Sequence, residues 1–115
     1  MSQTQDLVKR HIDAFNNHDV DALLADFAPS AEWVTGDYTV PKGQLREFFT
    51  SAMKSITPQL TLRRSIDGGD AVAIEMTESW TNEGSSKSAA LIAIFDLSDG
   101  KIIRAKIYRE GSSDA

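Results

Sequence analysis

The sequence predicts an α+β domain in which three amino-terminal helices pack on a curved antiparallel sheet, forming a cone around a pocket. Apolar residues first recur at the three- and four-residue spacing of amphipathic helices, between residues 2 and 56. After Pro58 they alternate with polar residues, as in strands that bury one face. Short sequences rich in Asp, Asn and Gly separate the alternating segments and predict tight turns.

The first predicted helix begins near Ser2, which forms a capping-box pattern with Gln5. His11 lies on or beside the apolar stripe of this helix, and residues 16–18, Asn-Asn-His, end it. The stripe consists of residues at helical spacing: Leu7, Val8, Ile12 and Phe15. We therefore expect His11 to project from the first helix toward the space beneath the sheet.

A second, short helix follows, with Asp19 as its capping residue and Pro29 beyond its end. Its apolar residues follow the i, i+3, i+4, i+7 pattern: Val20, Leu23, Leu24 and Phe27. Residues 31–35 then predict a strand, and alternation places these side chains on one face: Ala31, Trp33 and Thr35. Residues 36–38 turn away from that strand.

A third helix follows residues 41–43, Pro-Lys-Gly, and ends at Pro58. Its apolar face is formed by residues at helical spacing: Leu45, Phe48, Phe49, Ala52, Met53 and Ile56. This helix is therefore strongly amphipathic and is expected to pack on the sheet.

Four strands joined by three hairpins follow Pro58, which predicts an antiparallel meander. The turns fall at residues 67–70, 82–84 and 98–100. One face of the second of these strands carries Val72, Ile74, Met76, Glu78 and Trp80. We expect residues 1–115 to form one domain, with residues 111–115 as a disordered tail.

The strand at residues 88–97 is apolar on both faces. One face carries Ala90, Ile92 and Ile94, and the other carries Ala89, Leu91, Ala93, Phe95 and Leu97. In an antiparallel sheet with one solvent-exposed face, apolar residues alternate with polar ones. Because this strand is apolar on both faces, helices would cover one face and a second protein surface would cover the other face. In so short a chain a second copy is the simplest cover, which predicts a homodimer through the outer sheet face.

Composition narrows the possible partners and the location. The net charge of −5 disfavours binding to nucleic acid and to anionic membranes, and no apolar run approaches the length of a membrane span. No cysteine is present, which excludes disulfides and thiolate metal sites. We therefore expect a cytoplasmic protein that binds neither nucleic acid nor membranes.

Three sequence features together resemble the SnoaL-like branch of the NTF2-like superfamily. They are AFNNHDVDAL at residues 14–23, Gly43 before the third helix, and SDGKIIRAKIY at residues 98–108. The resemblance runs from about Val8 to Arg109 and implies the superfamily's fold. The group contains polyketide cyclases, ketosteroid isomerases, dehydratases, epoxide hydrolases and many members without an assigned activity, so the fold does not identify a reaction.

Comparison with the ketosteroid isomerases tests one specific mechanism. Their tyrosine, carboxylate base and protonated aspartic acid would correspond here to His11, Thr35 and Ile94. Threonine does not abstract a carbon-bound proton at neutral pH, and isoleucine donates no hydrogen bond, so that mechanism is not expected. The same comparison directs these side chains toward the cavity: Met76, Glu78, Trp80, Ile92, Ile94, Ala105, Ile107 and Arg109.

Glu78 and His11 are the candidate catalytic residues. Between Met76 and Trp80, Glu78 is either a carboxylate in an apolar cavity, where burial raises its pKa, or a strand-end residue that is solvated or paired with Arg109. His11 is either its proton partner, as the dehydratases of the superfamily imply, or a satisfied core or rim residue. Arg109 either binds a ligand carboxylate or neutralises Glu78.

The expected ligand is a small hydrophobic molecule. The predicted binding residues are the aromatic, methionine, aliphatic and arginine side chains around the pocket: Trp33, Tyr38, Phe49, Met53, Met76, Trp80, Ile94, Ile107 and Arg109. No metal or cofactor motif is present, so we expect neither group. The sequence thus favours cofactor-free acid–base isomerisation, cyclisation or dehydration; the alternative is a non-catalytic ligand-binding or dimerisation module.

Overall fold

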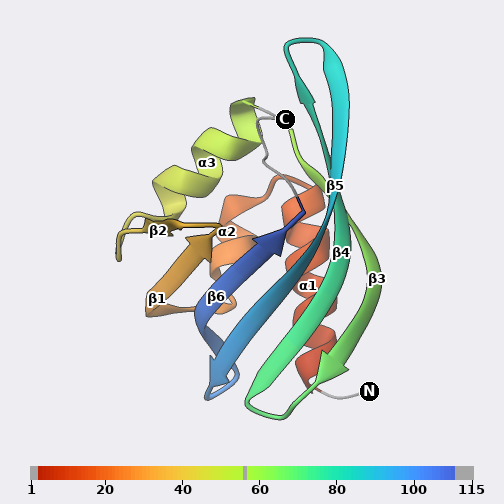
Figure 1. Ribbon diagram of the computed structural model, residues 1–115. Helices are drawn as coiled ribbons and strands as arrows, with labels where there is room; N and C mark the ends of the chain where they lie inside the picture. The colour runs from red at the N-terminus through yellow and green to blue at the C-terminus, as the bar shows by residue number, and fades with distance from the viewer. Residues whose placement is uncertain (1–2, 56, 111–115) are drawn as a thin grey trace.

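The structure is a computed structural model that describes residues 3–55 and 57–110. Its helices are α1 (Gln3–Asn16), α2 (Val20–Leu24) and α3 (Leu45–Ser55). Its strands are β1 (Phe27–Thr35), β2 (Tyr38–Val40), β3 (Gln59–Asp67), β4 (Ala71–Asn82), β5 (Ser85–Ser98) and β6 (Lys101–Arg109). They form one sheet in the order β2-β1-β6-β5-β4-β3 (Figure 1).

The sheet confirms the predicted meander but is mixed rather than antiparallel. Strands β3 to β6 pair antiparallel with their sequence neighbours, at the three predicted turns. Strand β1 pairs with β6 in parallel, and between these two strands the chain passes through β2, α3 and strands β3 to β5. Strand β2, at Tyr38–Val40, was not predicted, since three residues are too few for a period of two to be recognised.

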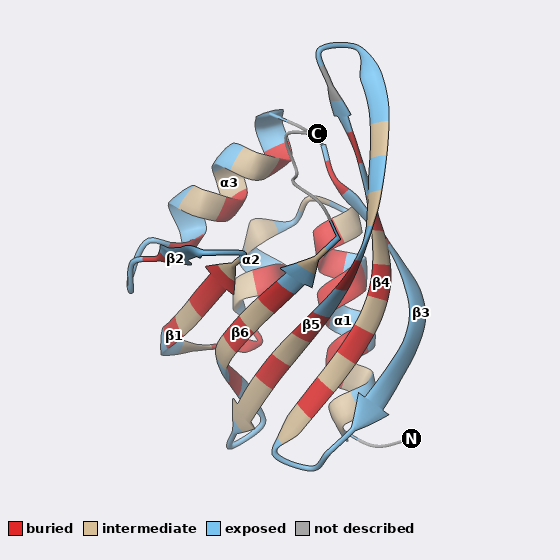
Figure 2. Ribbon diagram, in the orientation of Figure 1, coloured by how far each residue is buried: buried red, intermediate tan, exposed pale blue. Residues whose placement is uncertain are grey.

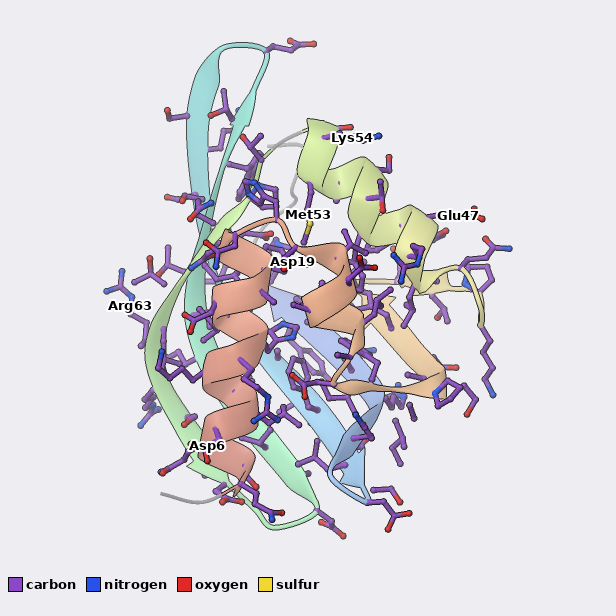
Figure 3. All side chains as sticks on the ribbon, turned by 180° about the vertical axis from the view of Figure 1, so that it is seen from behind. Asp6, Asp19, Glu47, Met53, Lys54 and Arg63 are labelled. Atoms are coloured by element: carbon purple, nitrogen blue, oxygen red, sulfur yellow. The ribbon has the colours of Figure 1, made fainter. Side chains whose placement is uncertain are left out.

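Helices α1 and α2 lie against one face of the sheet, as Figure 3 shows from that side. In the part of the chain that the structure describes, α1 and α2 precede the sheet, whereas α3 falls between β2 and β3. The predicted stripe of α1 is confirmed as buried: Leu7, Val8, Ile12 and Phe15. The predicted contributions of Ser2 and Ile56, and the predicted tail at residues 111–115, lie outside the described residues.

The start of β1 corrects the predicted end of the second helix. Asp19 caps α2 as predicted, since its side chain accepts a hydrogen bond of 3.1 Å from the backbone of Ala22. Phe27, however, lies in β1 and pairs with Ile102 of β6. Its apolar side chain satisfies a helical pattern and a strand pattern equally well, and pairing with β6 decides between them.

Asn16 fastens the end of α1 to the beginning of β3. Its side-chain amide donates to the carbonyl of Leu60 at 2.9 Å, and the Leu60 N–H donates to the Asn16 Oδ1 at 2.6 Å. Gln59 adds a hydrogen bond of 2.9 Å from its side chain to the Asn16 carbonyl. These contacts hold Leu60, the first buried residue of β3, beneath the sheet.

Burial along β5 shows which of its apolar faces points inward. Leu91, Ala93 and Phe95 are buried against the helices, whereas Ile92 is 42% exposed on the opposite face and Ile94 is half-buried there. Figure 2 shows this alternation along β4 to β6, beside a β3 that is exposed along most of its length. The expectation that Ile92 and Ile94 face the cavity is therefore wrong, because a strand with two apolar faces fits either orientation.

The β4–β5 hairpin extends beyond its neighbouring strands. Pairing of β3 with β4 reaches only Ser79, and pairing of β6 with β5 reaches only Leu91. Residues 80–87 therefore form a two-stranded ribbon that projects from the sheet (Figure 1). None of the helices described is long and apolar enough to cross a membrane.

Candidate functional site

A cavity of about 30 Å³ lies between α1 and the inner face of the sheet. Three polar side chains line it: His11 from α1, Glu78 from β4 and Arg109 from β6. The rest of the lining is apolar: Phe15, Trp33, Leu60, Met76, Leu91, Ala93, Phe95 and Ile107. About 30 Å³ is the volume of a single water molecule in the liquid, so the cavity is nearly filled by its own walls.

Glu78 and Arg109 form a largely buried ion pair at this cavity. Arg109 donates from Nε at 3.1 Å and from Nη2 at 2.6 Å, and both hydrogen bonds end on Oε1 of Glu78. The side chains are only 17% exposed for Arg109 and 9% exposed for Glu78. Among the described residues no hydrogen bond reaches Oε2, so one carboxylate oxygen remains available as an acceptor.

Thr35 holds the other end of the guanidinium. Arg109 Nη1 donates to Thr35 Oγ1 at 3.1 Å, so β1, β4 and β6 together orient one side chain. The sequence indicated Thr35 only as the place where the isomerase base would stand. Its hydroxyl instead positions Arg109. Arg109 in turn neutralises Glu78, and this is one of the two roles that the sequence left open for the arginine.

His11 lies in an aromatic enclosure and is 1% exposed. Its Nδ1 is buried without a hydrogen-bond partner among the described residues. Burial lowers its pKa to about 4, and the charge of Asp26 opposes this shift only in part. At neutral pH the imidazole is therefore uncharged. The centroids of four aromatic rings lie between 4.9 and 6.3 Å from the His11 ring: Phe15, Phe27, Trp33 and Phe95.

The structure brings six of the predicted site residues to one cavity. These are His11, Glu78, Trp33, Met76, Ile107 and Arg109. Five apolar residues that also line the cavity were not predicted from the sequence: Phe15, Leu60, Leu91, Ala93 and Phe95. The alternation of β5 already grouped Leu91, Ala93 and Phe95 on one face, and only the side on which the helices pack was undetermined.

Five predicted binding residues lie outside the cavity lining. Phe49 packs edge-on against Trp33, with the two ring centroids 4.8 Å apart, and Met53 and Trp80 are buried elsewhere. Tyr38 is exposed and stacks on Phe48 at 6.3 Å. Ile94 lies on the outer face, so the inward side chains on either side of it are those of Ala93 and Phe95. Neither side chain can donate the hydrogen bond that a buried acid would provide at this place.

A second hollow, of about 540 Å³, is an open surface depression between the start of α1 and two turns, lined by Asp6, Arg10 and Asp99 among others. None of the predicted site residues lines it. Within the part of the chain that the structure describes, no three His, Cys, Asp or Glu side chains are grouped as a metal site would require.

Comparison with known proteins supports the fold. A family model described as a SnoaL-like domain matches residues 8–105. An NTF2-like protein of unknown function from Burkholderia pseudomallei K96243 is 19% identical, with a TM-score of 0.87 over 96% of this chain and 92% of that chain. An epoxide hydrolase of the LEH-like type from M. tuberculosis is 17% identical, with a TM-score of 0.84 over 94% of this chain and 83% of that chain.

A third structure contains a small ligand. It is a protein with a ketosteroid isomerase-like fold from Catenulispora acidiphila DSM 44928, in complex with trimethylamine. It is 18% identical, with a TM-score of 0.79 over 89% of this chain and 83% of that chain. At these identities the likenesses concern the fold alone. No curated protein matches the sequence.

Proposed function

Because this chain belongs to the SnoaL-like family and has the NTF2-like fold, we propose that it binds a small hydrophobic molecule between α1 and the sheet. We propose further that it catalyses a cofactor-free acid–base reaction there: an isomerisation, cyclisation or dehydration. One observation carries the proposal: two polar residues with unused hydrogen-bonding atoms line one largely apolar cavity. His11 has a buried Nδ1 with no partner among the described residues, and Oε2 of Glu78 accepts no hydrogen bond from them. Buried polar groups are normally satisfied, and exceptions mark candidate sites.

Each polar residue has a distinct role in this proposal. Glu78 is the general base, because a carboxylate paired with a guanidinium carries a negative charge and accepts a proton at its free oxygen. It would take a proton from a carbon beside a carbonyl, and the electron pair of the broken C–H bond would move to the carbonyl oxygen. His11, uncharged and with its proton on Nδ1, would donate a hydrogen bond to that oxygen. Arg109 would orient Glu78, and Thr35 would orient Arg109.

A ligand larger than water has to displace side chains that line the cavity. Met76 is the most adaptable of them, since its unbranched side chain repacks at low cost. The protein with a ketosteroid isomerase-like fold that was crystallised in complex with trimethylamine supports a ligand of modest size. We therefore propose that the cavity opens as the ligand enters, rather than standing open beforehand.

Proton exchange tests the acid–base proposal without knowledge of the natural substrate. In heavy water, the protein is expected to accelerate deuterium incorporation beside the carbonyl of cyclopentanone, followed by NMR. Glu78→Gln is expected to lower this rate roughly 100-fold or more, because it removes the base and preserves its shape. Glu75→Gln is the matched control, since Glu75 lies on the same strand but on its other face. Equal rates of deuterium incorporation for the wild-type protein, both variants and buffer alone would contradict the catalytic proposal.

The nearly filled cavity and the apolar outer face favour a second candidate, a dimerisation module. The outer-face patch consists of paired side chains on β3 to β6: Ile66, Ala73, Ile92, Ile94 and Tyr108. Ile66, Ile92 and Tyr108 are exposed in the single chain. A second copy of the chain would cover this patch with the same patch of its own.

Analytical sedimentation tests the proposed dimer directly, because it measures the oligomeric state of the protein in solution. The wild-type protein is expected to sediment as a dimer at micromolar concentration, and Ile92→Lys as a monomer, since the substitution buries a charge in the interface. Ser51→Lys, on the exposed side of α3, is the control and is expected to remain dimeric. A wild-type monomer at these concentrations would contradict the dimer.

A further inference from the structure

The polar groups of the cavity carry no net charge. Glu78 and Arg109 bear opposite charges and are joined by hydrogen bonds of 2.6 and 3.1 Å. His11 is uncharged at neutral pH, because burial lowers its pKa to about 4. The walls are otherwise apolar, so little solvent remains to screen a charge that enters.

The remaining hydrogen-bonding capacity is specific. The hydrogen bonds of Arg109 to Glu78 and Thr35 use three of its five N–H groups, one on each guanidinium nitrogen. Glu78 Oε2 accepts none from the described residues and therefore offers a charged acceptor. A hydroxyl or N–H group of a ligand fits this oxygen. A carboxylate ligand would meet like charge there, and the cation that could offset it is already paired.

Resting on the proposed function, we infer that the cavity takes a neutral molecule that donates a hydrogen bond to Glu78, such as a small alcohol or phenol, and rejects a carboxylate of the same shape. The sequence left carboxylate binding by Arg109 open. The geometry assigns Arg109 to Glu78 instead, so the ion pair acts as a selectivity element against anions.

Three probes of nearly the same shape test this selectivity: benzyl alcohol, toluene and benzoate. Since each must open the cavity equally, the cost of opening cancels when they are compared. At pH 7, benzyl alcohol is expected to bind the wild-type protein at least tenfold more tightly than benzoate, with toluene between them or equal to benzoate. Calorimetry gives the dissociation constants, and amide shifts of Ala93 and Ile107 in NMR spectra locate the probe.

Two substitutions are expected to change the preference in opposite directions. Glu78→Gln keeps the shape and removes the negative charge, so Arg109 is left unpaired and benzoate is expected to bind at least as tightly as benzyl alcohol. Arg109→Gln leaves Glu78 unpaired, so benzylammonium is expected to overtake benzyl alcohol. Glu75→Gln, on the outer face, is the control that keeps the wild-type order.

The outcomes separate this inference from the proposed function. If no probe binds the wild-type protein and no cavity amide shifts, the ligand pocket fails, and this inference fails with it. If benzoate binds the wild-type cavity as tightly as benzyl alcohol, the selectivity inference alone is overturned and the pocket stands. The wild-type comparison decides both questions, even if a charge-removing variant does not fold.

Discussion

Replacing Arg109 by methionine is expected to lower the free energy of unfolding by about 3–5 kcal/mol. The substitution leaves the Glu78 carboxylate, 9% exposed, without its counter-charge, and removes the donor that satisfies Thr35. Methionine retains much of the arginine's apolar volume, so the loss reports charge and hydrogen bonding rather than packing. Urea unfolding at pH 7, followed by circular dichroism, measures it.

Arg104→Met provides the matched control for this result. Arg104 also lies on β6 and pairs with a glutamate at 3.1 Å, but the side chains of Arg104 and Glu32 are 42% and 35% exposed. An exposed pair contributes about 0–1 kcal/mol, so the control is expected to lose little stability. The double variant Glu78→Leu/Arg109→Met is expected to recover most of the loss, since no charge remains buried. Equal effects of Arg109→Met and Arg104→Met would contradict a desolvated pair.

Lowering the pH from 7 to 4 is expected to reduce the free energy of unfolding of the wild-type protein by about 3 kcal/mol through protonation of His11 alone. The pKa of His11 is about 4 in the folded protein and 6.5 as its ordinary value. Between these values the unfolded chain binds a proton on His11 that the folded chain does not bind. Stability therefore decreases as the pH is lowered through this window. Well above pH 6.5, where His11 is uncharged in both the folded and the unfolded chain, its contribution no longer depends on pH.

His11→Phe isolates this contribution. Phenylalanine preserves the ring among its aromatic neighbours and removes the unpartnered Nδ1, so at pH 7 the variant is expected to be at least as stable as the wild type. Urea midpoints at pH 4, 5, 6 and 7 give the comparison, and the difference between the proteins is expected to grow as the pH falls. Parallel curves would contradict a buried, uncharged His11.

The same variant connects stability with the proposed function. If His11 serves the ligand, His11→Phe is expected to gain stability at acidic pH and to lose deuterium exchange into cyclopentanone. A polar group that destabilises the folded state and yet is needed for activity is a common compromise at functional sites. A simple core residue would show the gain in stability without the loss of exchange.

Elements that depend on neighbouring residues in the chain could be predicted from the sequence. The stripe of α1 placed His11 inward, because residues three and four apart share a helix face. Asp19 marked the start of α2, and the Asp-, Asn- and Gly-rich turns marked the hairpins. Alternation along β4 put Glu78 on the same face as Met76, and both line the cavity.

Features that depend on distant segments could not be predicted from the sequence and follow from the packing of the folded chain. The inward face of β5, the parallel pairing of β1 with β6, and the hydrogen bonds of Arg109 to Glu78 and Thr35 join residues that are tens of positions apart. Local patterns leave such choices open. A strand that is apolar on both faces can pack with either face inward, and an arginine at the end of a strand can pair with any of several acceptors. Packing of all the elements on one core selects among them, and here it pairs the arginine with Glu78 and nearly fills the cavity beside it.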